Sequence, residues 1–272
     1  MTFGKDFDPD SEYIGGTEPI PLETAVKQEY INLFKEERNA LWKRLVWLNM
    51  NVFLLTKLEQ FPFEVFFLSY EMNFWNVTVA GLQYSSVMIA CSIWCDEDSR
   101  VLTITGFANE IRDKYINDSY REEFIRRISC YQDFETIECT QKKLIKLRNN
   151  VYAHFNRDWH IAYSDSEIEQ RRIQLRDLQQ TCRFVNRMFD AICFDAFFSK
   201  LPLSYQLSSS QSGDTSREAD VDSIFKSLLR GNHVLNMPEQ QKEFWPYYRA
   251  NLDEKKISLF NEYRRWLGLS EA

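Results

Sequence analysis

The chain has 272 residues, of which 44% are hydrophobic and 27% are charged, and its formal net charge is −7. This composition is typical of a globular protein with a sizeable core, and the negative charge argues against non-specific binding of nucleic acid by the whole surface. Only 8 Gly and 7 Pro occur beside 21 Phe, 13 Tyr and 7 Trp. Because turn residues are scarce, we predict an all-α protein of several long helices.

The cysteines and the N-terminus indicate the expected environment of the protein. The six cysteines include no pair with the two-residue spacing of a zinc knuckle or a redox motif. With only three histidines in the chain, little is available to build a metal site. Residues 1–10 lack the basic start and apolar run of a secretory signal. We therefore expect a cytoplasmic protein with reduced cysteines, no metal and no cofactor.

The first helix is predicted after an N-terminal arm. Residues 1–21 combine glycines, prolines and acidic side chains, and we expect them to form a flexible arm. A helical pattern then runs from Leu22 to about Leu58. Its apolar stripe comprises Leu41, Leu45, Leu48, Val52 and Leu55.

A second helix is predicted from Pro62 to about Cys95, since proline suits the first turn of a helix. Residues 72–95 carry no charge and are numerous enough to span a bilayer. Polar residues lie within this segment, and its flanks are acidic without a basic anchor. We interpret it as a buried central helix of a soluble bundle, with no membrane. Gly81 and Ser85, one turn apart, would let another helix approach closely.

Two further helices frame the middle of the chain. Thr105 is the candidate N-cap of a short helix that ends near Ile116. A later helix, predicted after Ser166, carries a seven-residue apolar repeat. We favour packing of this repeat inside the chain's own bundle over packing against another chain. The repeat comprises Ile168, Leu175, Leu178, Cys182, Val185, Phe189, Ile192 and Ala196.

The C-terminal part differs in composition from the helices before it. Pro202 ends the last bundle helix, and a serine-rich segment comes after it. We predict a bundle over residues 22–203, a flexible linker over 204–222 and a helical C-terminal extension over 223–272.

Residues 141–157 end a long helical pattern and contain five basic residues and no acidic one. Such a local patch would attract a nucleic-acid backbone despite the negative charge of the whole chain. The alternative is an ordinary solvated helix face. The basic residues are Lys142, Lys143, Lys146, Arg148 and Arg157.

The spacing of Arg148 and His154 limits what a regular helix could do with them. Six positions place the two side chains about 120° apart around the helix and about 9 Å apart along it. Arg148 would reach His154 by its own length, through a loosened helix near Ala153, or in a site completed by a second copy of the chain. The structural alternative is a half-buried histidine at a helix end and an arginine paired with a neighbouring carboxylate.

Two segments carry a resemblance to a known family. Residues 148–154, Arg-Asn-Asn-Val-Tyr-Ala-His, resemble the signature of HEPN-domain ribonucleases, in which an Arg and a polar residue precede a His. The segment from Ser92 to Asp96 and the Leu102-Thr103-Ile104 start resemble the abortive-infection, U-type branch of that superfamily. The resemblance covers roughly residues 25–200.

The resemblance implies a HEPN-like bundle and a metal-independent endoribonuclease of toxin or antiphage type. The RNA 2′-hydroxyl would attack the adjacent phosphate, with His154 as acid or base and Arg148 stabilising the phosphate charge. Asn149 would orient this pair, and Asn150 would fix the histidine ring. The lysines and Arg157 named above would position the RNA phosphates.

The same resemblance implies partners. HEPN proteins commonly supply the second acid–base group by dimerising, so we expect a homodimer that acts on RNA, with tRNA as one candidate substrate. An antitoxin or other regulator is a further expected partner. Asn156 stands where toxins adenylylated by a nucleotidyltransferase carry a Tyr, so that modification is not expected. The alternative function is a catalytically silent helical module that binds a protein or nucleic-acid partner.

Overall fold

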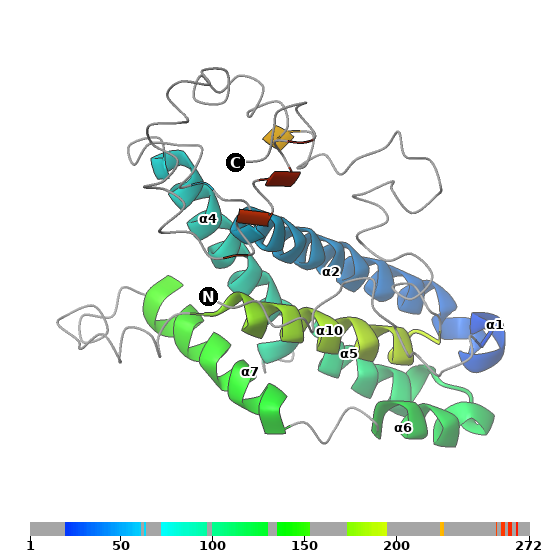
Figure 1. Cartoon of the computed structure of the whole chain (residues 1–272). Coiled ribbons are helices and arrows are strands. Elements are labelled where there is room, and N and C mark those ends of the chain that lie inside the picture. The colour runs from blue at the N-terminus through cyan, green and yellow to red at the C-terminus, as the bar shows by residue number, and fades with distance from the viewer. Residues whose placement is uncertain are drawn as a thin grey trace, which may run out of the picture. The chain divides into compact units, whose positions relative to one another are not determined.

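The structure is a computed structural model that describes residues 20–60, 63, 72–96, 100–129, 135–152 and 173–194, with isolated positions between 224 and 265. The regular elements of these residues are all helical (Figure 1), and Val26 and Ile116 form an isolated antiparallel bridge. The prediction of an all-α protein is therefore confirmed.

The chain divides into two compact units. The first unit draws on residues 1–52 and 83–204, and the second on residues 53–82 and 205–272.

The N-terminal helical pattern is broken into three elements. They are α1 (Leu22–Ala25), the 3₁₀ turn η1 (Gln28–Tyr30) and the long α2 (Ile31–Gln60). The predicted continuous helix from Leu22 is interrupted because Val26 is extended and bridges to Ile116. Lys27 N donates to Tyr115 O at 2.8 Å beside this bridge. The predicted apolar stripe of α2 is confirmed, since each of its five residues is at most 4% exposed.

The apolar helix is α4 (Met72–Ala90), continued by the π-helical turn η2 (Cys91–Cys95). Its buried α-helical residues lie near its C-terminal end, whereas Phe74 and Val77 are 66% and 72% exposed. The prediction of a helix buried all round is therefore wrong for its first half. The absence of charge could not show this, because uncharged Asn73 and Asn76 are also exposed.

Two further expectations concerned this helix: a close approach of another helix at Gly81, and its length relative to a membrane. A Cβ built on Gly81 would meet no atom of the described residues within 4 Å, so none of the described helices makes the predicted close approach there. Residues Met72–Cys95 are long and apolar enough to cross a membrane by length and composition, and 33% of the most apolar window is buried.

Helix α5 (Ile104–Glu110) continues as the π-helical turn η3 (Ile111–Tyr115), and η4 (Asp118–Tyr120) leads into α6 (Arg121–Ser129). Thr103 caps α5, because its Oγ1 accepts a hydrogen bond from Gly106 N at 3.0 Å. The prediction of Thr105 as the cap is wrong, since Thr105 already lies inside the helix. The Leu102-Thr103-Ile104 start of this helix is confirmed.

Helix α7 (Glu135–Leu147) continues as the π-helical turn η5 (Arg148–Tyr152), and α10 (Leu175–Ile192) packs against α5, α6 and α7 (Figure 1). The described positions of the seven-residue repeat are at most 7% exposed. Packing inside the chain's own bundle is thereby confirmed for α10. The buried positions are Leu175, Leu178, Cys182, Val185, Phe189 and Ile192.

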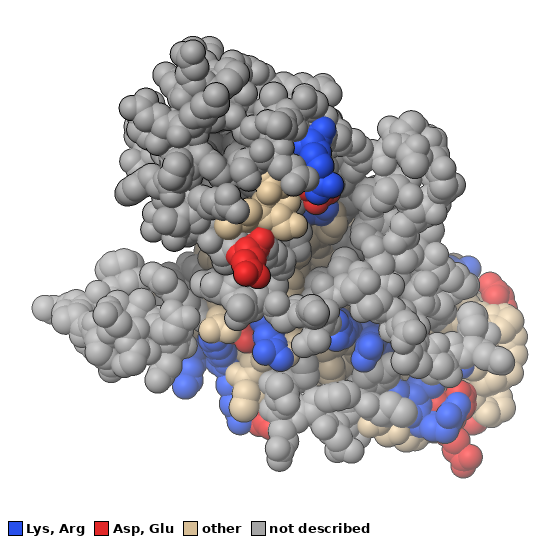
Figure 2. All heavy atoms as spheres, viewed as in Figure 1, with Lys and Arg blue, Asp and Glu red and all other residues tan. Residues whose placement is uncertain are grey.

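Charged side chains of both signs are interspersed on the described surface (Figure 2). Several form short-range pairs on one segment, such as Lys114–Glu110 at 2.6 Å and Arg121–Asp118 at 3.0 Å. Exposed pairs of this kind contribute little to stability.

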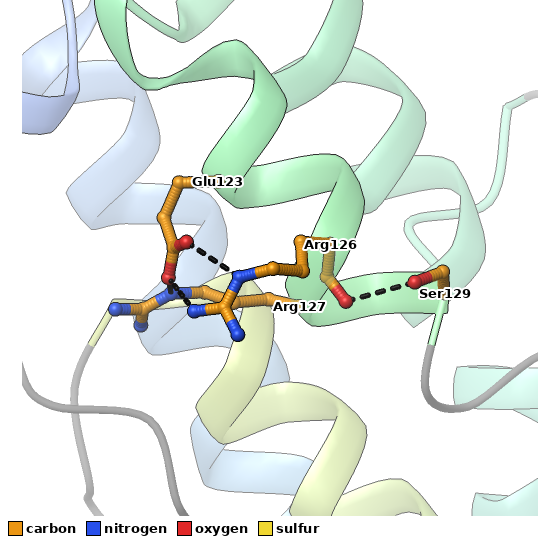
Figure 3. A network of polar contacts seen from close by, with 4 residues as sticks. All are labelled: Glu123, Arg126, Arg127 and Ser129. Atoms are coloured by element: carbon orange, nitrogen blue, oxygen red, sulfur yellow. Dashed lines mark hydrogen bonds and ion pairs between the residues drawn. The ribbon is translucent and has the colours of Figure 1, made fainter.

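Arg127 of α6 brings a charge into the core of the first unit. Its Nε donates to Glu123 Oε1 at 2.9 Å, and its guanidinium lies 5.6 Å from the centre of the Phe194 ring. Glu123 also accepts two hydrogen bonds from Arg126 (Figure 3). Because Arg127 is 4% exposed, Glu123 compensates a charge that water barely reaches.

The second unit contains an aromatic cluster of Phe63, Trp75 and Phe225. The ring centres of Phe63 and Trp75 are 4.7 Å apart, and Phe225 lies 6.0 Å from Phe63. Phe225, which is 1% exposed, comes from the predicted C-terminal extension, whereas Phe63 and Trp75 come from the predicted bundle range. The predicted linker lies outside the described residues, as does the predicted arm up to residue 19.

Candidate functional site

Arg148 opens the π-helical turn η5 directly after α7. Leu144 and Leu147, on the apolar face of α7, are 0% and 4% exposed and anchor the helix end. A π-helical turn is wider than an α-helical one and occurs frequently at functional sites. A loosened helix near Ala153 was one of the expected alternatives, and the structure shows that the helix already widens at Arg148.

Asp96 is the charged partner of Arg148. Arg148 Nη1 lies 3.5 Å from Asp96 Oδ2, and the two side chains are 24% and 29% exposed. Asp96 directly follows the π-helical turn η2. An arginine paired with a carboxylate was expected as the structural alternative, but the sequence did not identify Asp96 as the partner. The only signal was the acidic turn at residues 96–98.

Arg148 is also held from within its own turn. Its Nε donates to Asn149 Oδ1 at 3.0 Å, so the structure brings these two predicted site residues together. Among the described residues, no hydrogen bond or ion pair other than those to Asn149 and Asp96 engages the guanidinium. Its remaining donors are therefore not committed to the described part of the protein.

Cys91 and Cys95 are buried, and both lie near enough to Arg148 to be affected by its charge. The hydrogen bond between the two thiols lowers the pKa of Cys91 and raises the pKa of Cys95, whose burial raises it further. The positive charge of Arg148 favours the thiolate form at both positions. The guanidinium therefore sits between buried groups and solvent, where its charge is less screened than on an open surface.

The predicted phosphate-positioning lysines differ in their surroundings. Lys142 Nζ lies 2.6 Å from Glu138 Oε1, and Lys143 Nζ lies 2.7 Å from Asp177 Oδ2 on α10. Lys146 is exposed and forms no ion pair within the described part of the chain. Among the three lysines of α7, Lys146 is therefore the one whose charge is not paired with a carboxylate of the described residues.

Asn150 makes a local contact one turn back along the chain. Its Nδ2 donates to the Lys146 carbonyl at 2.9 Å. The residues that it was predicted to support or accompany, His154 and Arg157, lie outside the described residues. No group of three or more His, Cys, Asp or Glu side chains that could hold a metal ion is found in the described part.

Comparisons with known proteins agree with the motif and the fold. Residues 31–213, more than half of the chain, match the family model HEPN_AbiU2, described as AbiU2. No curated protein and no solved structure matches the chain. The resemblance to the abortive-infection, U-type branch is thereby confirmed, and the chain belongs to the AbiU2 family of HEPN domains, which is related to abortive infection.

Proposed function

We propose that this HEPN protein is a metal-independent endoribonuclease of toxin or antiphage type that acts in the cytoplasm. Family membership supports the proposal, and the loose engagement of Arg148 carries it. Its distance of 3.5 Å from Asp96 exceeds the value of about 2.9 Å typical of a charge-assisted hydrogen bond. A guanidinium held this loosely can exchange the carboxylate for an RNA phosphate.

The chemistry follows from the residue types of the motif. Histidine is the side-chain type that most often acts as a general acid or base, so His154 takes the proton of the RNA 2′-hydroxyl or supplies one to the leaving 5′-oxygen. Arg148 stabilises the negative charge on the phosphate oxygens, and Asn149 holds its Nε. The products are a 2′,3′-cyclic phosphate and a free 5′-hydroxyl, and no step requires a metal.

The reaction removes one proton and supplies another, whereas one motif contains a single histidine. We therefore propose a homodimer in which two copies of the motif build one site. Lys146 and Arg157 would position phosphates along the RNA. Lys142 and Lys143 would join them only by exchanging their partners Glu138 and Asp177. An antitoxin or other regulator would restrain the activity.

The test is cleavage of end-labelled total RNA and tRNA by the purified full chain in excess chelator. We expect cuts that end in a cyclic phosphate. His154→Ala should slow them by about 10² to 10⁴-fold, and Arg148→Ala by about 10² to 10³-fold. His160→Ala, outside the motif, is the matched control and should cut like the wild type. Light scattering gives the mass, and a fully active monomer would refute the composite site.

The Arg148–Asp96 pair also supports a second candidate, a silent helical module in which both residues are structural anchors. In that case a folded dimer would cut no RNA. Asp96→Asn would then lower the free energy of unfolding and would leave RNA cleavage, absent in the wild type, unchanged.

A further inference from the structure

A cavity of about 690 Å³ lies beside the Arg148–Asp96 pair within the first unit. Asp96 itself lines this cavity. Other walls come from α2, η2, α5, η3 and α7, which contribute Glu37, Trp94, Glu110, Tyr115 and Gln141. This volume is in the range of pockets that bind small organic molecules, and it is large enough for a nucleoside.

The π-helical turns of the described residues gather around this cavity. Trp94 and Cys95 of η2 and Tyr115 of η3 line it, while Arg148 of η5 contacts its wall through Asp96. In η3 the widened turn is visible directly, because Ile116 N donates to Ile111 O at 3.0 Å. Since π-helical turns occur frequently at functional sites, their convergence marks this cavity as a binding site.

The charged groups of the lining are mostly acidic. Three carboxylates, those of Glu37, Asp96 and Glu110, line the cavity together with one guanidinium, that of Arg100. Asp96 pairs with Arg148, and Glu110 pairs with Lys114 at 2.6 Å. Such a lining repels phosphate groups, so phosphate would stay outside at Arg148 while a neutral group enters.

Glu37 is the lining carboxylate whose hydrogen-bond partner is neutral. Its Oε2 accepts a hydrogen bond from the Tyr115 hydroxyl at 3.0 Å, and it forms no ion pair with a described residue. Tyr115 is 2% exposed and stacks on Tyr30 with ring centres 5.1 Å apart, so its hydroxyl is fixed in place. Burial is the main reason why the pKa of Glu37 is raised. An oriented carboxylate with unused lone pairs favours a ligand that donates hydrogen bonds.

We propose that this cavity binds a guanine base of the RNA, with the Glu37 carboxylate accepting hydrogen bonds from guanine N1–H and N2–H. The inference rests on the proposed ribonuclease function and adds a base preference to it. Guanine presents two adjacent N–H donor groups on its Watson–Crick edge, whereas adenine, cytosine and uracil each present only one donor group there. Only guanine therefore matches both oxygens of one carboxylate.

The position of the cavity suits this role. A base bound at Glu37 lies inside the acidic lining, and the phosphate that follows it lies toward Arg148, whose partner Asp96 belongs to the same wall. With the other bases, the half-buried Glu37 carboxylate would keep its hydrogen bond from Tyr115 but leave acceptor positions unused, and unmet hydrogen-bonding groups discriminate well between ligands.

The first experiment measures binding of free guanosine, adenosine, cytidine and spermidine to the full chain by calorimetry. We expect guanosine to bind at least about tenfold more tightly than the other nucleosides. Glu37→Gln should abolish this difference, and Glu36→Gln, an exposed neighbour on α2, should preserve it. Tyr115→Phe, which removes only the orienting hydroxyl, is a second variant and should weaken guanosine binding less. Equal binding of all nucleosides, or Glu37-dependent binding of spermidine alone, would overturn the proposal.

The second experiment maps cleavage sites and separates the two possible failures. We expect wild-type cuts next to guanosine, and Glu37→Gln cuts without that preference. Cleavage that requires His154 but ignores the base would refute the guanine site and leave the ribonuclease intact. Guanosine binding by a chain that cuts no RNA would instead refute the ribonuclease, and with it the place of the base next to a cleaved phosphate.

Discussion

Asn49 of α2 and Asn186 of α10 exchange two amide hydrogen bonds, from Asn49 Nδ2 to Asn186 Oδ1 at 2.8 Å and from Asn186 Nδ2 to Asn49 Oδ1 at 2.7 Å. Asn49 is 9% exposed and lies among the buried leucines of α2. A shift of either helix by one residue would break both of these hydrogen bonds beside an apolar layer. The pair therefore fixes the register of the two helices.

Replacing one member of this pair should lower the free energy of unfolding more than replacing both members. Asn49→Leu leaves the Asn186 amide without its partner and should lower the free energy of unfolding by about 1 to 3 kcal/mol. The double variant with Asn186→Leu should recover much of this loss. Urea denaturation measures both values, and Asn39→Leu, an exposed site on α2, serves as the control. Simple additivity of the two single substitutions would contradict the paired arrangement.

The cap of α5 can be tested at two threonines that lie two residues apart. Thr103→Ala removes the acceptor of the Gly106 N–H and should destabilise the protein by about 1 kcal/mol. Thr105→Ala, at an exposed position inside the helix, should change stability by less than about 0.5 kcal/mol. Thermal unfolding of the two variants compares them directly, and an equal effect would remove Thr103 as the cap.

Phe189 is a fully buried residue of the α10 repeat. Phe189→Ala removes a ring from the interior and should lower the free energy of unfolding by about 3 to 5 kcal/mol. The exposed Arg176 on the same helix provides the matched variant, Arg176→Ala, with an expected change below about 0.5 kcal/mol. A loss at Phe189 as small as that at Arg176 would mean that α10 does not pack in the bundle.

Glu123 should make stability depend on pH in the acid range. The two hydrogen bonds from Arg126, and then the one from Arg127, hold the pKa of Glu123 below its ordinary value of 4.5. Its stabilising contribution is therefore complete above that value and is lost as the pH falls through the lowered pKa. Glu123→Gln should destabilise the protein at pH 7 by about 1 to 2 kcal/mol, because it leaves Arg127 less compensated.

The difference between wild type and Glu123→Gln should shrink steadily below pH 4.5 in urea titrations. Glu122→Gln, an exposed neighbour, should show neither the loss at pH 7 nor this convergence. A difference that stays constant down to pH 2 would show that the charge of Glu123 is not what compensates Arg127.

The sequence predicted the features that depend on helical periodicity. The apolar stripes of α2 and α10 were predicted because apolar residues recur every three or four positions along each helix. The residues at this spacing are the buried ones. The start of α5 was located, but its cap was placed at the wrong threonine. Backbone conformation decides this choice, since Thr103 is extended and Thr105 is helical.

Contacts between distant segments could not be read from the sequence. The partnership of Arg148 with Asp96 joins two helix ends, and the cavity at Glu37 depends on five elements. The burial of α4 was also misjudged, because a lack of charge describes composition and not the presence of a neighbouring helix. The π-helical turns were not predicted, because apolar periodicity identifies a helix but does not distinguish a π-helical turn from an α-helical one.

The π-helical turns also make the geometry of the site depend on the number of residues in the helices that contain them. Each such turn accommodates one residue more than an α-helix would hold in the same path. Deleting one residue from Cys91–Cys95 or Ile111–Tyr115 would restore a regular helix and rotate the next residues of the chain by about 100°. After a deletion in the first of these turns, Asp96 would point away from Arg148, although both side chains of the pair would be unchanged. Within this family, relatives that keep these residues but differ by one position in helix length would have lost the site.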